Sequence, residues 1–137
     1  MNLAPASVPL VYQAIAAVLA PYAREELTGM SCIARGADSI FARAVLDLGG
    51  KLEVVLPSRN YREQKVRPDH AREFDDLMRQ AAKVHTLPFD QANRDAYEAA
   101  NEMLLSFCDR LFAVWDGQGG VDKGSTAAAV AQRSGSR

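Results

Sequence analysis

The sequence predicts an α/β fold in which helices flank a mostly parallel sheet. Short apolar runs alternate with longer segments whose apolar residues recur at helical spacing. Turns of small residues separate a predicted strand from a predicted helix at 34–38 and again at 116–126. With 137 residues, of which 48% are hydrophobic and 24% charged, the chain fits one domain covering residues 1–137.

The first half of the chain alternates from helix to strand twice. A helix is expected over 11–22, where apolar residues follow i, i+3, i+4, i+7 spacing; Ser7 can cap it and Pro9 fits its first turn. A strand at 27–33 leads into a second helix that opens at 34–38 and stops at Gly49-Gly50. The next predicted strand, 52–56, ends at Pro57.

The second half continues the alternation, beginning with a polar and basic segment that reads as a long loop. After the final predicted strand and the glycine-rich loop, an alanine-rich last helix is expected to follow Gly124-Ser125-Thr126. Ligands of such sheets bind beyond the carboxyl ends of the strands, which directs attention to 34–38, 57–60 and 116–126. The expected elements are a loop at 58–68, a helix from Asp69, a strand at 84–87, a helix at 92–107 and a strand at 111–115.

Composition argues against several classes of protein. Sixteen Lys and Arg against 17 Asp and Glu leave a net charge of −1, which argues against a nucleic-acid partner. The apolar runs are far shorter than the ~20 residues of a membrane span, and no secretory signal opens the chain. We therefore expect a cytoplasmic protein with no membrane partner. Cys32 and Cys108 are expected to be reduced core thiols, and His70 and His85 are not spaced for a metal.

Two strand-to-helix turns could hold an anion. At residues 34–38, backbone N–H groups of a helix N-terminus could approach a phosphate, with Arg35 as a clamp. The alternative is an ordinary tight turn in which Asp38 favours the helix dipole. The loop at 117–126 offers glycines, Lys123 and two hydroxyls, but it matches neither a Walker A motif nor a GxGxxG motif.

Three further groups of residues lie where a site is expected. Tyr97 and Asn101 are spaced i, i+4 and share a helix face that is expected to be half-buried. They either contact a ligand or make a structural hydrogen bond. The segment 58–61 follows a strand, where its arginine is either functional or simply solvated. Asp116 could accept a hydrogen bond from a sugar hydroxyl or fix the glycine-rich loop.

Taken in order, several segments resemble the SMF/DprA-LOG (SLOG) superfamily over residues 8 to about 132. They are Ala-Arg-Gly-Ala-Asp, Val-Val-Leu-Pro, Ala-Tyr-x-x-x-Asn, Cys-Asp-Arg-Leu-Phe-Ala-Val-Trp-Asp-Gly and Gly-Ser-Thr-Ala. The resemblance implies a Rossmann-like three-layer sandwich with a pocket for a nucleotide or nucleotide-derived small molecule, and no separate cofactor. It implies that the pocket is lined by Arg35, Gly36, Asp38, Pro57, Tyr97, Asn101, Asp116, Gly124, Ser125 and Thr126.

The chain departs from this superfamily at the position of a catalytic residue. The phosphoribohydrolase branch, which releases cytokinin bases from their ribotides, has a Gly-Gly-x-Gly-Thr-x-x-Glu motif. Here only alanine, at 127–129, is available for the glutamate. We therefore expect a non-catalytic nucleotide-binding domain in sensing or signalling. The alternatives are a nucleoside-monophosphate phosphoribohydrolase, a DNA-handling module supported by the basic loop 59–67, and an interaction domain with a vestigial pocket.

The ends of the chain also differ from the superfamily pattern. Related proteins open with a strand before the first helix and close with another after the last, and the sequence shows neither. An absent interior strand would leave backbone groups unpaired. The region of Leu3 could fill the gap, two chains could pair across it, or the sequence could be trimmed from a longer one. We therefore expect a homo-oligomer.

Overall fold

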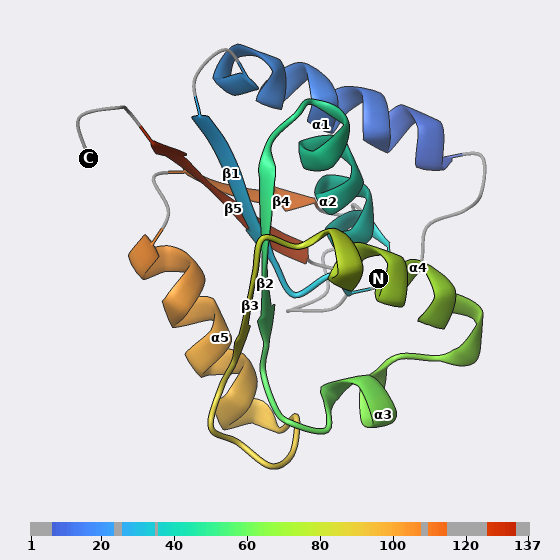
Figure 1. The fold of residues 1–137 in the computed structure, drawn as a ribbon, viewed down its shortest axis with the longest axis vertical. Helices are drawn as coiled ribbons and strands as arrows, with labels where there is room; N and C mark the ends of the chain where they lie inside the picture. The colour runs from blue at the N-terminus through green and yellow to red at the C-terminus, as the bar shows by residue number, and fades with distance from the viewer. Residues whose placement is uncertain (1–6, 24–25, 35, 108–109, 115–125, 134–137) are drawn as a thin grey trace.

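The computed structural model describes residues 7–23, 26–34, 36–107, 110–114 and 126–133, and in these residues five strands form one sheet (Figure 1). The strands are β1 (Glu26–Ser31), β2 (Lys51–Leu56), β3 (Lys83–Thr86), β4 (Arg110–Val114) and β5 (Thr126–Arg133). The helices are α1 (Val8–Ala23), α2 (Ala37–Asp47), α3 (Tyr61–Lys65), α4 (Pro68–Gln80) and α5 (Arg94–Phe107).

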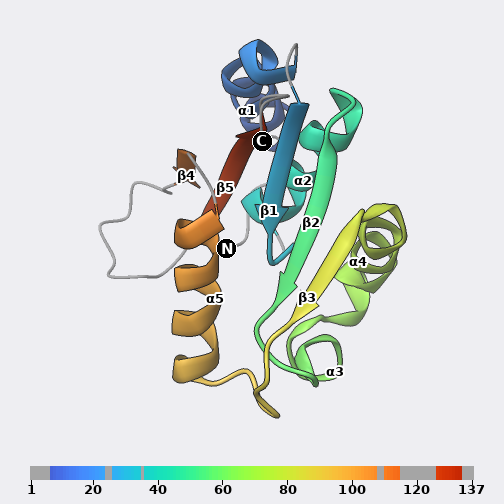
Figure 2. The ribbon, with the colours of Figure 1, turned by 60° about the vertical axis from the view of Figure 1, so that its left-hand side comes forward.

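The sheet has the order β3-β2-β1-β5-β4. Strand β1 pairs with β2, and β2 with β3, in parallel, whereas β5 runs antiparallel to both of its neighbours. Strand β4 therefore points the same way as β1, β2 and β3. Helices α1, α2 and α4 lie on one face of the sheet and α5 lies on the other (Figure 2). The predicted α/β sandwich, Rossmann-like with helices on both faces, is confirmed.

The close packing of α2 on β1 is set by a glycine. A Cβ on Gly29 would lie 2.6 Å from Cγ2 of Val45 and 3.0 Å from the ring of Phe41. Any side chain at this position would push α2 away from the strand. Met30, the next residue, belongs instead to the core cluster under α5. The alternation of strand side chains thus places one core on each face of the sheet.

The predicted last helix is wrong, because residues 126–133 form the strand β5. The expectation that no strand lies in this part of the chain is wrong for the same reason. Alanine has the highest intrinsic helix propensity, which explains the prediction. The segment nevertheless pairs with β1 along one edge and with β4 along the other. Hydrogen bonds from two neighbouring strands outweigh a propensity of less than about 1 kcal/mol per residue.

The segment 58–68 is not a continuous loop as expected. It contains the five-residue helix α3, and α4 begins at Pro68, one residue before the predicted start. Tyr61 explains the difference, because its ring is buried and packs 6.2 Å from that of Phe74. Because the segment contains many charged residues, the sequence did not indicate that Tyr61 is buried.

A proline in the middle of β5 tests the position of this strand. Ala129 pairs with Met30 of β1 and with Leu111 of β4. We expect Ala129→Pro to destabilise the fold by about 3 kcal/mol or more, which lowers the thermal midpoint by roughly 10 °C. Ala129→Ser keeps the backbone N–H and serves as the control. A melting temperature that is equal in both variants would contradict the central position of β5.

Candidate functional site

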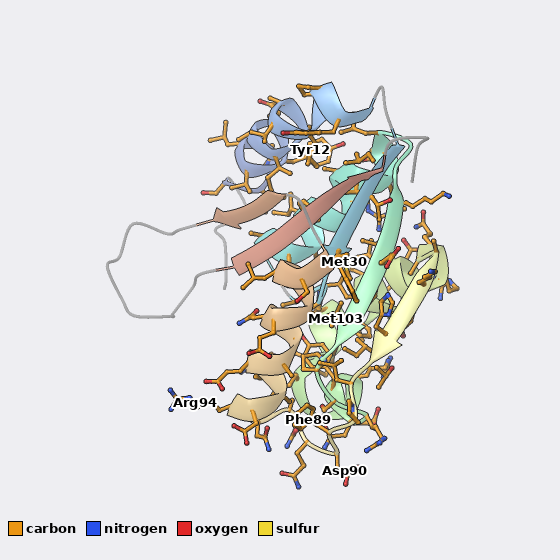
Figure 3. All side chains as sticks on the ribbon, turned by 90° about the vertical axis from the view of Figure 1, so that its left-hand side faces the viewer. Tyr12, Met30, Phe89, Asp90, Arg94 and Met103 are labelled. Atoms are coloured by element: carbon orange, nitrogen blue, oxygen red, sulfur yellow. The ribbon has the colours of Figure 1, made fainter. Side chains whose placement is uncertain are left out.

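The carboxyl ends of β1, β2 and β3 meet at one edge of the sheet, beside α3 and the start of α5 (Figure 1). Figure 3 places Phe89, Asp90 and Arg94 at this end of the molecule. The turn from β1 to α2 has an unusual backbone here. Ile33 has a φ of +46°, which is costly for a β-branched residue, and Gly36 has a φ of +91°. Such strain persists only where neighbouring groups hold the backbone in place.

Buried side chains hold this turn through its carbonyl oxygens. The hydroxyl of Ser39 donates to the carbonyl of Ala34 at 2.7 Å, and Nε2 of His70 lies 3.2 Å from the carbonyl of Ile33. Because a carbonyl only accepts, Nε2 must carry the proton that it donates. His70 also lies 3.3 Å from Oγ of Ser39, and its Nδ1 lies 3.4 Å from Glu73.

This Ser-His-Glu arrangement has the order of a catalytic triad but not its chemistry. A nucleophilic serine needs an unprotonated imidazole nitrogen to take its proton. Here the nitrogen facing Ser39 donates to a carbonyl, and the hydroxyl proton of Ser39 is also given to a carbonyl. Both side chains are buried. The arrangement therefore stabilises the turn and does not act as a nucleophile.

Asp38 lies in the first turn of α2 and is 4% exposed. Its Oδ2 accepts the backbone N–H of Ala34 at 3.2 Å. Its Oδ1 is buried and has no hydrogen-bond partner among the described residues. Burial raises the pKa of Asp38 to about 7, although the Ala34 N–H, the positive charge of the amino terminus and the Ser31 hydroxyl oppose this shift. A buried carboxyl oxygen without a donor is uncommon and costs stability.

Three other polar-tipped side chains share the surroundings of Asp38. Tyr61 and Tyr97 meet edge to face, with ring centroids 6.4 Å apart, and Cys32 follows β1 as a half-buried free thiol. Burial, and then the charge of Asp38, raises the pKa of Cys32. Burial also raises the pKa of both tyrosines. We call Cys32, Asp38, Tyr61 and Tyr97 the carboxyl-edge cluster; at neutral pH only Asp38 in it is close to ionising.

The structure places half of the predicted site residues at or near this cluster. Asp38 and Tyr97 belong to it, Gly36 begins the turn before Asp38, and Pro57 is buried directly after β2. Thr126 begins β5 beside the end of β4. The remaining predicted residues, except Asn101, lie outside the described residues: Arg35, Asp116, Gly124 and Ser125.

The prediction that Tyr97 and Asn101 lie on a half-buried face of α5 is wrong for Asn101. Asn101 is exposed, and Tyr97 is 37% exposed. The buried stripe of the helix consists of Ala96, Ala100 and Leu104. Tyr97 still reaches the cluster because its ring contacts Tyr61, whereas Asn101 is one turn further along. The buried face of α5 consists largely of alanines, which are small and weakly hydrophobic, so the sequence did not indicate it.

Two members of the cluster were not predicted to be site residues for different reasons. Tyr61 lies in the segment 58–61 that follows a strand, and this position was the signal that could have identified it. Cys32 was predicted to be a core thiol. The neighbouring arginines are paired at the surface: Arg59 with Asp90 at 2.6 Å and Arg62 with Asp75 at 2.6 Å. These pairs leave less free positive charge for nucleic acid than the sequence indicates.

A separate hollow of about 370 Å³ lies between α1, α2 and α4. Its wall is largely apolar, and several of its polar groups are already engaged. Tyr12 donates to Asp47 at 2.7 Å, and Arg43 pairs with Asp76 at 2.8 Å. This hollow is lined by Val8, Pro9, Tyr12, Gln13, Ile40, Arg43 and Glu73, none of which belongs to the carboxyl-edge cluster.

Within the described residues, no three His, Cys, Asp or Glu side chains are grouped closely enough to hold a metal ion. None of the described helices is long and apolar enough to cross a membrane. Comparison of the chain with protein-family models, with curated proteins and with solved structures finds no match.

The pH dependence of stability tests the environment of Asp38. Its pKa is about 7 in the folded chain against an ordinary 3.8, so between these values the folded state holds a proton that the unfolded state has lost. The contribution of Asp38 to stability is therefore intact below pH 4 and falls as the pH rises to 7. We expect Asp38→Asn to gain roughly 1–4 kcal/mol relative to wild type between these pH values.

Urea unfolding of both proteins at several pH values measures the difference between their free energies of unfolding. The other carboxylates are present in both proteins, so their contributions cancel in this difference. The exposed Asp95 provides the control variant Asp95→Asn. A difference between wild type and Asp38→Asn that stays constant with pH would show that Asp38 is ionised normally in the folded chain.

Proposed function

We propose that this chain is a nucleotide-binding domain that acts in sensing or signalling without catalysing a reaction. The observation that carries the proposal is the buried, unpartnered Oδ1 of Asp38 at the carboxyl edge of parallel strands. In doubly wound sheets this edge is where ligands bind. The resemblance of the ordered motifs to the SLOG superfamily supports the same ligand class. The cytoplasmic location and the homo-oligomer expected from the sequence stay predictions.

The chemistry of the cluster suits a nucleoside better than a metal or a bare anion. Tyr97 offers a partly exposed aromatic ring, on which a base can stack. Asp38 offers a hydrogen-bond acceptor, and Tyr61 and Cys32 stay protonated at neutral pH. A ligand that combines a flat ring with hydroxyl or amino groups meets all of these features.

A thermal-shift screen tests this function. The panel contains nucleoside monophosphates, NAD, ADP-ribose and cyclic dinucleotides. A ligand at about 100 times its Kd adds about 2.7 kcal/mol of stability, so we expect at least one compound to raise the thermal midpoint by several degrees. Tyr97→Ala should abolish the rise, because it removes the exposed ring of the cluster.

Two further variants complete the thermal-shift screen, one as a control and one as a test of a predicted contact. Leu105→Ala, on an exposed position two turns further along α5, should leave the ligand response intact. Arg35→Ala tests the clamp expected from the sequence. A folded wild-type chain whose midpoint responds to none of these compounds would overturn the proposed function.

A second candidate function, N-glycoside hydrolysis of a nucleoside monophosphate, is favoured by one observation. A carboxyl group with a pKa of about 7 has the value expected of a general acid or base at neutral pH. Such hydrolysis ordinarily employs two carboxyl groups, and Asp38 is the single one in the carboxyl-edge cluster. We therefore rank binding without catalysis first.

Product analysis separates the two functions. Each monophosphate is incubated with the chain, and free base is measured by chromatography. We expect no base above the rate of an enzyme-free control. Release of base that disappears in Asp38→Asn and persists in Asp95→Asn would replace the binding function with the hydrolase.

A further inference from the structure

The unpartnered oxygen of Asp38 identifies which end of a ligand faces α2. We propose that Oδ1 of Asp38 accepts a hydrogen bond from a hydroxyl or amino group of the bound molecule. The sugar or base end of a nucleotide, and not its phosphate, then lies against the first turn of α2. This inference rests on the proposed nucleotide-binding function and assigns the orientation of the ligand within that site.

The described donors around Asp38 are already engaged. The N–H of Ala34 goes to Oδ2, which fixes the plane of the carboxyl group and directs Oδ1 away from that N–H. The hydroxyl of Ser31 lies 3.4 Å from the backbone carbonyl oxygen of Asp38 and accepts the N–H of Ile33 at 2.9 Å. No described donor lies within hydrogen-bond distance of Oδ1. A donor on a bound molecule would satisfy it.

Electrostatics argue against a phosphate at the same position. The N-terminus of a helix ordinarily attracts anions. In α2, however, the first turn already contains the buried carboxyl of Asp38. A phosphate close to this group would repel its ionised form in surroundings of low dielectric. The carboxyl-edge cluster itself contains no lysine or arginine, although the positive charge of the amino terminus acts on Asp38 and lowers its pKa. An uncharged donor avoids the repulsion and also stabilises the carboxylate.

The cluster reaches the surface through the residues that flank Asp38. Tyr97 is 37% exposed and Cys32 is half-buried, whereas Tyr61 is 4% exposed. A nucleoside whose base stacks on Tyr97 would extend toward Asp38 with its hydroxyl or amino groups. Sugar hydroxyl groups and base amino groups both donate a hydrogen bond to an oxygen such as Oδ1. The experiment therefore has to distinguish a donor on the sugar from a donor on the base.

Calorimetric titration of wild type and Asp38→Asn with nucleoside monophosphates, at pH 6.5 and 8.0, tests the inference. A donor to the carboxylate should make wild-type binding about fourfold tighter at pH 8.0, which is the change in ionised fraction of a group with a pKa of about 7. Asp38→Asn should bind at least about tenfold more weakly and should lose this pH dependence. The phosphate of the ligand titrates equally with both proteins, so its effect on affinity cancels when their pH dependences are compared.

Among the described residues, the other titratable groups near Asp38 are those of the cluster and His70, and the positive charge of the amino terminus also acts on Asp38 and lowers its pKa. Cys32, Tyr61 and Tyr97 have raised pKa values and keep their protons over this pH range. His70 faces the carbonyl of Ile33 on the neighbouring part of the turn.

Analogues that each lack one hydrogen-bond donor identify whether the group that bonds to Oδ1 belongs to the sugar or to the base. The 2′-deoxy, 3′-deoxy and base-deaminated forms of the tightest monophosphate are titrated into both proteins. We expect one analogue to lose affinity in wild type but not in Asp38→Asn, which would assign the donor to the sugar or to the base.

Three results would overturn the inference. Equal affinities of wild type and Asp38→Asn would show that the ligand donates no hydrogen bond to Oδ1. Wild-type binding that weakens as the pH rises, unlike that of the variant, would show that a protonated Asp38 donates to the ligand. Wild-type chain that binds no nucleotide at all would instead reject the proposed function, and this inference with it.

Discussion

The turn between β1 and α2 is the constraint on which the site depends. Gly29 lets α2 lie directly on β1, so the chain must reverse within the few residues that separate the two elements. It does so through positive φ values at Ile33 and Gly36. Ser39 and His70 then hold the carbonyl groups of Ala34 and Ile33 in the turn. Because α4 supplies His70, the packing of a distant helix fixes the position of the turn.

The same turn gives the site its electrostatic character. Burying Asp38 costs hydration that a single N–H from Ala34 does not replace, and this cost raises the pKa of the carboxyl to about 7. Around it, Cys32 and the two tyrosines are protonated at neutral pH. Within the carboxyl-edge cluster, Asp38 is thus the one group that titrates near neutral pH. Such a site favours an uncharged donor over an anion, which reverses the role that the helix N-terminus alone suggests.

Local patterns in the sequence predicted the elements that follow a single periodicity. The strand at 52–56 and the helix at 92–107 were predicted nearly as they occur, as β2 and α5. The residues of the site were predicted less well. Asp38 was expected as part of an anion-binding turn or of an ordinary one. Asn101 was expected on a half-buried face, but the alanines at 96 and 100 form the buried stripe.

The sequence by itself determined the α/β class and the edge at which a site should lie, because alternating periodicities and strand-to-helix turns are local properties. Only the tertiary structure decided two other features. Residues 126–133 became a strand because two strands flank them, against the helix propensity of their alanines. Asp38 became a buried acceptor in a cluster with Tyr61, which is distant in sequence and packs against Tyr97. Pairing and burial depend on neighbours that no local pattern contains.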